Sequence, residues 1–157
     1  ANGGYKIYPK IVMDDENKIS PIDKFTPLYK NSKNIKIVQD AMFASTNEVR
    51  GTSYRSRIDD PKYQFAGKTG TAQVKKITER DRELDLKTFQ IPYEERDHAL
   101  YIAYGPYKNP RYALSILVEH GGNGSTTAAP MAKKLFKTII DRHQLRESIN
   151  NKKYLDI

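Results

Sequence analysis

The 157-residue sequence contains no cysteine and no tryptophan. The absence of cysteine excludes a disulfide framework, a thiolate metal site and a thiol nucleophile. No stretch reaches the roughly 20 consecutive apolar residues that a membrane-spanning helix needs, and no basic, apolar and small-residue leader stands at the start. The chain opens at Ala1-Asn2-Gly3-Gly4 without a methionine, so we expect it to be a piece of a longer protein.

Acidic residues are in the minority: 19 stand against 27 basic ones, which gives a formal net charge of +8 at pH 7. A basic balance is compatible with nucleic acid, an anionic membrane surface or an acidic polymer as a partner. The lysines occur as isolated pairs, such as Lys75-Lys76 and Lys133-Lys134, and not as long blocks. The 11 tyrosines are scattered and form no base-stacking pattern. We therefore predict a solvated basic surface and no nucleic-acid partner.

The first half of the chain predicts an extended arm, a loop and a helix. Residues 5–12 alternate and tolerate a proline, which is typical of an edge strand, and residues 14–33 are predicted as loop. Ser32 is the expected N-cap of the helix, which Gly51-Thr52-Ser53 ends. Apolar or small residues recur at helical spacing and predict one buried stripe: Ile35, Val38, Ala41, Met42, Ser45 and Val49.

The second half predicts three strands and a long helix. Residues 65–74 form the first core strand, and residues 99–104 and 112–118 form an antiparallel hairpin around a proline-bounded turn. Residues 75–97 are predicted as a long charged connection, and such connections are usually functional or mobile.

Ser125 or Thr126 is expected to cap the last helix. Its predicted buried face comprises Met131, Leu135, Phe136, Ile139, Ile140 and His143. The order of elements indicates an α+β fold, an antiparallel sheet packed against a long C-terminal helix. We expect a domain part over residues 1–150 and a frayed or disordered tail over 151–157.

The run Lys68-Thr69-Gly70-Thr71 carries the clearest chemical signal. Side chains alternate across a strand, so Thr69 and Thr71 share one face, and two hydroxyls about 7 Å apart can hold a carboxylate. Gly70 lets a substrate backbone lie close to the strand, and an extended peptide could pair with its edge. Lys68 adds a positive charge, and a free backbone N–H at the strand end could stabilise an oxyanion by roughly 3 kcal/mol.

The flanking residues make the pattern more specific. Residues 65–74 read Phe-Ala-Gly-Lys-Thr-Gly-Thr-Ala-Gln-Val and are similar to the third-motif strand of class B penicillin-binding proteins. Further similarities follow the same order over residues 34–145: Gly51-Thr52-Ser53 upstream, then Arg96-Asp97-His98, residues 103–110 and residues 118–124. The Arg-Asp-His entry to the second strand most resembles the penicillin-binding protein 2 type.

This resemblance implies the C-terminal part of a peptidoglycan D,D-transpeptidase domain. The complete enzyme would be anchored in the inner membrane, with its catalytic domain in the periplasm. It would cross-link stem peptides through a covalent serine ester, and β-lactams would acylate the same serine. Lys68 would join the catalytic hydrogen-bond network, and Thr69, Gly70 and Thr71 would hold the substrate or antibiotic. The Thr71 backbone N–H would form half of the oxyanion hole.

The departures from the family pattern are large. No serine stands three residues before a lysine, so the nucleophile and its base are both absent from this sequence. Ser32-Lys33-Asn34 matches the second motif in letters, but its position predicts the start of a helix instead. We therefore predict that this chain alone is inert in acyl transfer.

Two further expectations concern what the chain binds. As an alternative to a part of an enzyme, it could be a non-catalytic module that holds a peptide carboxylate on the Lys68–Thr71 strand. In either case the upstream half of its own domain is an expected partner. The apolar surface left without that half predicts self-association or strand exchange.

The remaining motifs predict no cofactor and no metal. Gly122-Asn123-Gly124 follows a strand and opens a helix, but it lacks the third small residue of a dinucleotide loop. His98, His120 and His143 lack metal-ligand spacing, and Glu94-Glu95 is expected to be a solvated pair in a charged loop.

Overall fold

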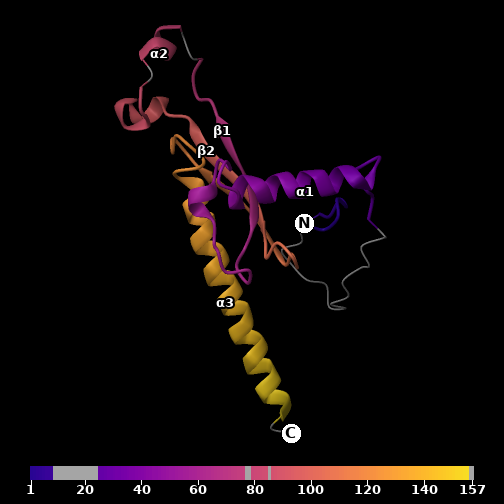
Figure 1. Ribbon diagram of the computed structural model, residues 1–157. Helices are drawn as coiled ribbons and strands as arrows, with labels where there is room; N and C mark the ends of the chain where they lie inside the picture. Colours follow the sequence, from indigo (N-terminus) through magenta and orange to yellow (C-terminus); the bar gives the residue numbers. More distant parts are fainter. Residues whose placement is uncertain (9–24, 77–78, 85, 156–157) are drawn as a thin grey trace.

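The computed structural model describes residues 1–8, 25–76, 79–84 and 86–155. The elements follow in the order α1 (Ser32–Asn47), η2 (Tyr54–Ser56), β1 (Ala66–Ala72), α2 (Glu79–Leu84), η3 (Thr88–Gln90), η4 (Tyr93–Glu95), β2 (His98–Gly105), β3 (Tyr112–Val118) and α3 (Ala128–Leu155). Figure 1 shows α1 and α3 packed against the strands, with α2 at the far end of a projection. The predicted α+β fold is confirmed.

The three strands form one antiparallel sheet in the order β1-β2-β3. Thr69 lies opposite Tyr101, and Tyr101 lies opposite Ile116 on the other side. The hairpin expected between the second and third strands is therefore present. In the described part of the chain β1 and β3 are each paired along one side, so both are edges of the sheet.

The core lies between the sheet and the first half of α3. Phe65 stacks on Phe136, with ring centroids 4.9 Å apart, and meets Tyr101 edge to face. All three side chains are fully buried, and burying each one stabilises the fold by roughly 1.5–3 kcal/mol. Three small residues let α3 approach this aromatic group closely: Ala128, Ala129 and Ala132.

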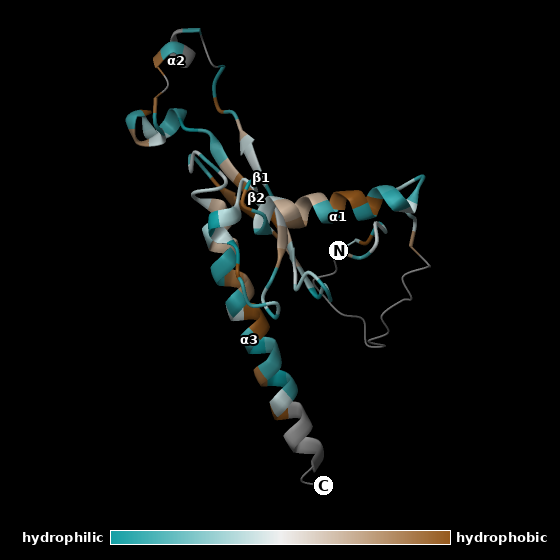
Figure 2. Ribbon diagram, in the orientation of Figure 1, coloured by the Kyte–Doolittle hydropathy of each residue, from teal (hydrophilic) through white to brown (hydrophobic). Residues whose placement is uncertain are grey.

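The expected helix α1 is present, but two details of its prediction are wrong. Asn31, and not Ser32, is the N-cap, and its side chain accepts a hydrogen bond from the Lys33 N–H. The predicted stripe is mostly uncovered: Val38 is 55% exposed and Val49, beyond the helix end, is 78% exposed. Figure 2 shows the apolar segment of α1 in the part of the helix that extends beyond the sheet.

The long helix α3 is also present, with a narrower buried face than predicted. Phe136 and Ile140 are buried as expected, whereas Met131 and Leu135 are each 44% exposed. The sheet covers one side of the helix, so apolar residues that flank the covered side remain in contact with solvent.

The start and the end of α3 both differ from the sequence-based expectation. Neither Ser125 nor Thr126 caps the helix, because both side-chain hydroxyls donate to Asn123. The Asn123 Oδ1 also accepts from the Ser125 N–H. The helix continues to Leu155, through most of the segment that we expected to fray. The division between domain and tail stays a prediction.

The connection over residues 75–97 is more ordered than a plain loop. It contains α2, η3 and η4 and projects away from the sheet (Figure 1). Of the predicted N-terminal arm, Tyr5 forms an isolated bridge with Pro27, and residues 9–12 lie outside the described residues, as does the part of the predicted loop over 14–24. Within the described ranges, none of the helices combines the length and apolar content that crossing a membrane requires.

Candidate functional site

The four residues Lys68 to Thr71 lie in β1, as predicted, at an edge of the sheet. Thr69 and Thr71 lie opposite Tyr101 and Ala99, so both threonines belong to the same face of the strand. Lys68 and Thr71 are exposed, and Thr69 is half-buried. These side chains are therefore at the surface and not enclosed in the apolar core.

A chain of hydroxyl groups leads from α1 to this strand. The Ser45 and Thr52 hydroxyl oxygens are 3.1 Å apart, and Thr52 Oγ1 is 3.4 Å from Thr69 Oγ1. Lys68 Nζ donates to the Thr69 carbonyl at 2.7 Å and lies 3.5 Å from Thr69 Oγ1. The sequence drew attention to Gly51-Thr52-Ser53, but no pattern indicated that Ser45 and Thr52 would join Thr69.

A buried tyrosine fixes the strand from the core side. The Tyr101 hydroxyl is 3.0 Å from the hydroxyl oxygens of both Thr46 and Ser53. The Gly67 N–H donates to Thr46 Oγ1 at 3.0 Å. Burial raises the pKa of Tyr101, so the hydroxyl keeps its proton. Helix α1, η2 and β1 are thus joined directly beneath the candidate site.

Two glycines set the space around the strand. A Cβ on Gly124 would lie 2.5 Å from the Leu100 carbonyl oxygen and 2.8 Å from that of Gly70, so the turn before α3 presses directly on the β1 and β2 backbones. A Cβ on Gly70 would meet the Leu100 Cβ at 3.3 Å and no other atom within 4 Å in the described structure. The Gly70 backbone is therefore supported by Gly124, and the position of a Gly70 side chain borders Leu100 alone among the described residues.

The end of β1 is tied to the base of the projecting connection. The Val74 N–H donates to Asp97 Oδ1 at 3.2 Å, and the Gly122 N–H donates to the Asp97 carbonyl at 2.8 Å. The His120 N–H donates to His98 Nδ1 at 2.9 Å. The Arg-Asp-His segment thus connects the candidate strand to the turn that precedes α3.

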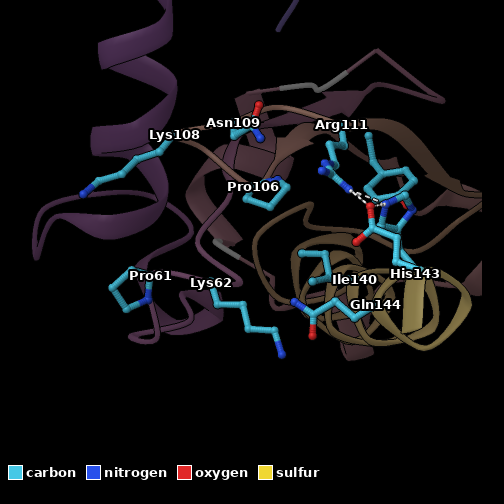
Figure 3. A pocket seen from close by; sticks show the side chains of 11 residues that line it. Pro61, Lys62, Pro106, Lys108, Asn109, Arg111, Ile140, His143 and Gln144 are labelled. Carbon is cyan, nitrogen blue, oxygen red and sulfur yellow. Dashed lines mark hydrogen bonds and ion pairs between the residues drawn. The ribbon is translucent and has the colours of Figure 1, made fainter. Parts of the chain in front are cut away.

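His143 belongs to a polar network that is separate from the candidate strand and lies beside α3 (Figure 3). His143 Nδ1 is 2.6 Å from the Tyr112 hydroxyl, and its Nε2 is 2.9 Å from Glu147. Arg111 also binds Glu147 and lowers the pKa of that carboxyl. Among the described residues no cluster of His, Cys, Asp and Glu has the arrangement of a metal site.

A mostly apolar groove of about 600 Å³ adjoins Lys68. Its walls come from α1, from the segment after α1 and from the sheet, and include Ile37, Val38, Met42, Thr52 and Ile102. Ile37 and Ile102 are largely exposed. The site therefore combines a polar edge strand with an open apolar wall.

Residues 1–140 match the family model of the penicillin binding protein transpeptidase domain. The peptidoglycan D,D-transpeptidase MrdA of Salmonella typhimurium is 36% identical over 105 residues. These residues make up 67% of this chain and 16% of the Salmonella protein.

Solved structures show the same relationship. The crystal structure of Pseudomonas aeruginosa PBP2 in complex with WCK 5153 matches with a TM-score of 0.62 and 28% identity, over 87% of this chain and 27% of that one. The complex between PBP2 and MreC from Helicobacter pylori matches with a TM-score of 0.58 and 30% identity, over 78% of this chain and 20% of that one. The chain therefore spans a minor part of the proteins that it resembles.

Proposed function

The chain belongs to the penicillin-binding protein transpeptidase family and is PBP2-like, and from that premise we propose that it supplies the substrate-binding strand of a peptidoglycan D,D-transpeptidase. The observation that carries the proposal is the geometry of β1. It is an edge strand whose two threonines share a face, and Gly70 between them adds no side chain to the strand.

Each residue of the strand has a role in this proposal. Thr69 and Thr71 hold the terminal carboxylate of a stem peptide or the carboxylate of a β-lactam through hydroxyl hydrogen bonds. Gly70 leaves room for the peptide backbone, which lies along the strand edge. The Thr71 N–H gives half of the oxyanion hole, and Lys68 supplies positive charge to the hydrogen-bond network of the site.

The covalent step needs a serine from outside this sequence, since no serine here stands three residues before a lysine. That serine attacks a stem-peptide carbonyl, and the peptide C–N bond breaks as the ester forms. An amine of a second stem peptide then displaces the serine oxygen and completes the cross-link. β-Lactams form the corresponding ester. In this reading the complete protein acts at the periplasmic face of the inner membrane in synthesis of the wall that sets cell shape.

The missing part of the domain is the proposed partner of the groove beside Lys68. Ile37 and Val38 are exposed there, and Met131 and Leu135 are exposed on α3. Apolar surface of this kind marks an interface. Without the upstream half, the chain is expected to self-associate, and sedimentation velocity tests this: a monomer at all concentrations would contradict it.

Labelling with a fluorescent penicillin tests the proposed function. The chain alone should stay unlabelled, and a longer chain that restores the upstream residues should be labelled covalently. Lys68→Ala in the longer chain should reduce the labelling rate by about a hundredfold, as loss of one catalytic-network group commonly does. Lys108→Ala, at an exposed lysine of the hairpin turn, is the matched control and should label normally.

The outcome also separates the two candidate functions. If the longer chain is never labelled but still binds a stem peptide reversibly through Thr69 and Thr71, the non-catalytic binding module is correct and the enzyme proposal is wrong.

A further inference from the structure

A second, strongly basic pocket lies between η2 and the start of α3. It has a volume of about 560 Å³. Two residues of η2 and six from the turn before α3 and its first turns line it: Arg55, Ser56, Ser125, Thr126, Pro130, Lys133, Lys134 and Lys137. We propose that this pocket binds a phosphate-bearing ligand.

The charges of the pocket have one sign. Arg55, Lys133, Lys134 and Lys137 line it, and the lining includes no acidic side chain among the described residues. None of the four makes an ion pair within the described ranges. Four cations facing one space repel one another unless an anion joins them, so the pocket favours a ligand with two or more negative charges.

Ser56 gives an independent indication of a ligand. It is 3% exposed, it lines the pocket, and its hydroxyl has no hydrogen-bond partner in the described part of the chain. The Ser56 oxygen is not among the described polar atoms that are both fully buried and unpartnered, so it borders the open space of the pocket and can donate to a ligand. A phosphate oxygen in the pocket would accept this proton.

The other hydroxyls of the pocket already have acceptors. Ser125 Oγ donates to Asn123 Oδ1 at 2.7 Å, and Thr126 Oγ1 donates to the Asn123 carbonyl at 3.3 Å. Their protons are therefore committed within the turn. Ser56 is the hydroxyl donor that remains for a ligand among the described residues of the pocket.

Helix α3 contributes side chains to the pocket and not free N–H groups. The pocket runs along the first turns of this 28-residue helix, where the Ala128 and Ala129 N–H groups donate to the Gly124 carbonyl and Pro130 has no N–H. Thr126, Pro130, Lys133 and Lys137 follow one another at helical spacing and face the pocket together. The guanidinium of Arg55 stands across from them on η2 and can bind two phosphate oxygens at once.

The pocket of Figure 3 is a natural comparison within the same molecule. It has a volume of about 310 Å³ and is also lined by basic residues, among them Lys62, Lys108 and Arg111. There, however, Arg111 is paired with Glu147 at 3.0 Å and Lys62 lies 3.6 Å from Asp141. Because its charges are largely neutralised, this pocket should bind phosphate much more weakly.

Titration of the 157-residue chain with inorganic pyrophosphate in low-salt buffer, followed by isothermal calorimetry, tests the proposal. We expect saturable binding of one pyrophosphate per chain. Lys133→Gln with Lys137→Gln should weaken it by about tenfold or more, since two charge-assisted contacts are lost. Ser56→Ala should weaken it by about fivefold through loss of one hydrogen bond. The control pair Lys62→Gln with Lys108→Gln should change the pyrophosphate dissociation constant less than about twofold, which is distinguishable from the roughly fivefold effect of Ser56→Ala.

A second arm identifies the source of the phosphate. The chain is mixed with phosphatidylcholine vesicles with and without phosphatidic acid, and sedimentation of the vesicles reports binding. If pyrophosphate displaces the chain from the acidic vesicles, and the Lys133/Lys137 variant does not bind them, a lipid headgroup can occupy the pocket. If pyrophosphate binds and the vesicles do not, the ligand is a soluble phosphate compound.

The proposal is overturned by two results. One is the absence of saturable binding in both arms. The other is binding that Ser56→Ala leaves unchanged and that the two lysine pairs weaken equally, because that result would show attraction to net charge alone. Far-UV circular dichroism of each variant shows whether its fold is intact.

Discussion

Replacing Gly67 by alanine tests how firmly the buried tyrosine fixes the candidate strand. A Cβ on Gly67 would lie 2.4 Å from the Tyr101 hydroxyl oxygen and 2.5 Å from Cζ of the same ring. Ordinary contacts are about 3.5–4.0 Å, so strand and ring must separate by about 1 Å. Tyr101 is fully buried and hydrogen-bonded to Thr46 and Ser53, which leaves it no free direction to move.

The expected cost follows from these contacts. Overpacking a core costs about 1–3 kcal/mol, and weakening the two hydrogen bonds of the Tyr101 hydroxyl adds about 1 kcal/mol each. Gly67→Ala should therefore lower the free energy of unfolding by about 3–5 kcal/mol, which is a large part of a typical domain's stability. Gly70→Ala, three positions along the same strand, meets the Leu100 Cβ at 3.3 Å and should cost less than about 1 kcal/mol.

Urea unfolding followed by far-UV circular dichroism measures both variants. A double-mutant cycle with Tyr101→Leu then identifies the cause, because the smaller side chain removes the clash. In that background Gly67→Ala should cost less than about 1 kcal/mol. Equal costs for Gly67→Ala and Gly70→Ala, or a cost that does not fall in the Tyr101→Leu background, would refute this reasoning.

The same pair of glycines separates stability from function. In a longer chain that carries the catalytic serine, Gly70→Ala should slow penicillin labelling by about tenfold to a hundredfold, since the added methyl group takes room that the proposal gives to the substrate backbone. Its unfolding midpoint should stay close to that of the unchanged chain. Normal labelling of the Gly70→Ala variant would show that the strand edge at this position does not receive the substrate.

Three further changes give distinct outcomes. The Tyr104 hydroxyl is buried without a partner among the described residues, so Tyr104→Phe should stabilise the fold by about 1 kcal/mol in urea unfolding at pH 7. Burial also raises the pKa of Tyr104 from 10.0 to about 12. The unfolded chain therefore ionises first, and the free energy of unfolding should fall as the pH rises from 10 through 12. Tyr104→Phe should remove that alkaline loss of stability. The hydrogen bond from Arg111 lowers the pKa of Glu147 below its usual 4.5, so Glu147→Gln should flatten the fall in melting temperature as the pH drops below that value. Gly122 has φ +75°, and its Cβ would lie 2.3 Å from Thr88 Cγ2, so Gly122→Ala should cost about 1–3 kcal/mol and speed limited proteolysis of the connection between β1 and β2; equal proteolysis rates would contradict this.

The regular elements could be predicted because their signals are local. Apolar runs over residues 99–104 and 112–118 mark two strands, and the short proline-bounded turn between them favours a hairpin. The strand that carries Lys68 to Thr71 was predicted in the same way. Helix α1 needed only the spacing of its apolar residues.

Burial was predicted less well, because it depends on what covers a helix and not on the helix itself. Val38 and Leu135 fit a helical stripe as well as Phe136 does, yet only Phe136 is covered by the sheet. The cap of α1 was missed by one residue, since Asn31 and Ser32 are both good N-caps and the choice depends on backbone geometry.

The support of the candidate site could not be predicted for a related reason. Thr46 and Ser53 meet the Tyr101 hydroxyl across 55 and 48 positions of sequence. No local pattern marks such a contact. The sequence therefore predicted the strand that carries the candidate residues, and the structure showed which contacts hold that strand in place.

The contact of Gly124 with the carbonyls of Gly70 and Leu100 has a consequence for inherited variation. The contact is between backbones, so no exchange of one side chain for another can compensate there, and every mutation of the Gly124 codon to another amino acid pushes the strand outward. If the proposed function holds, a substitution at Gly124 would displace Gly70 and so alter the candidate strand without replacing any residue from Lys68 to Thr71.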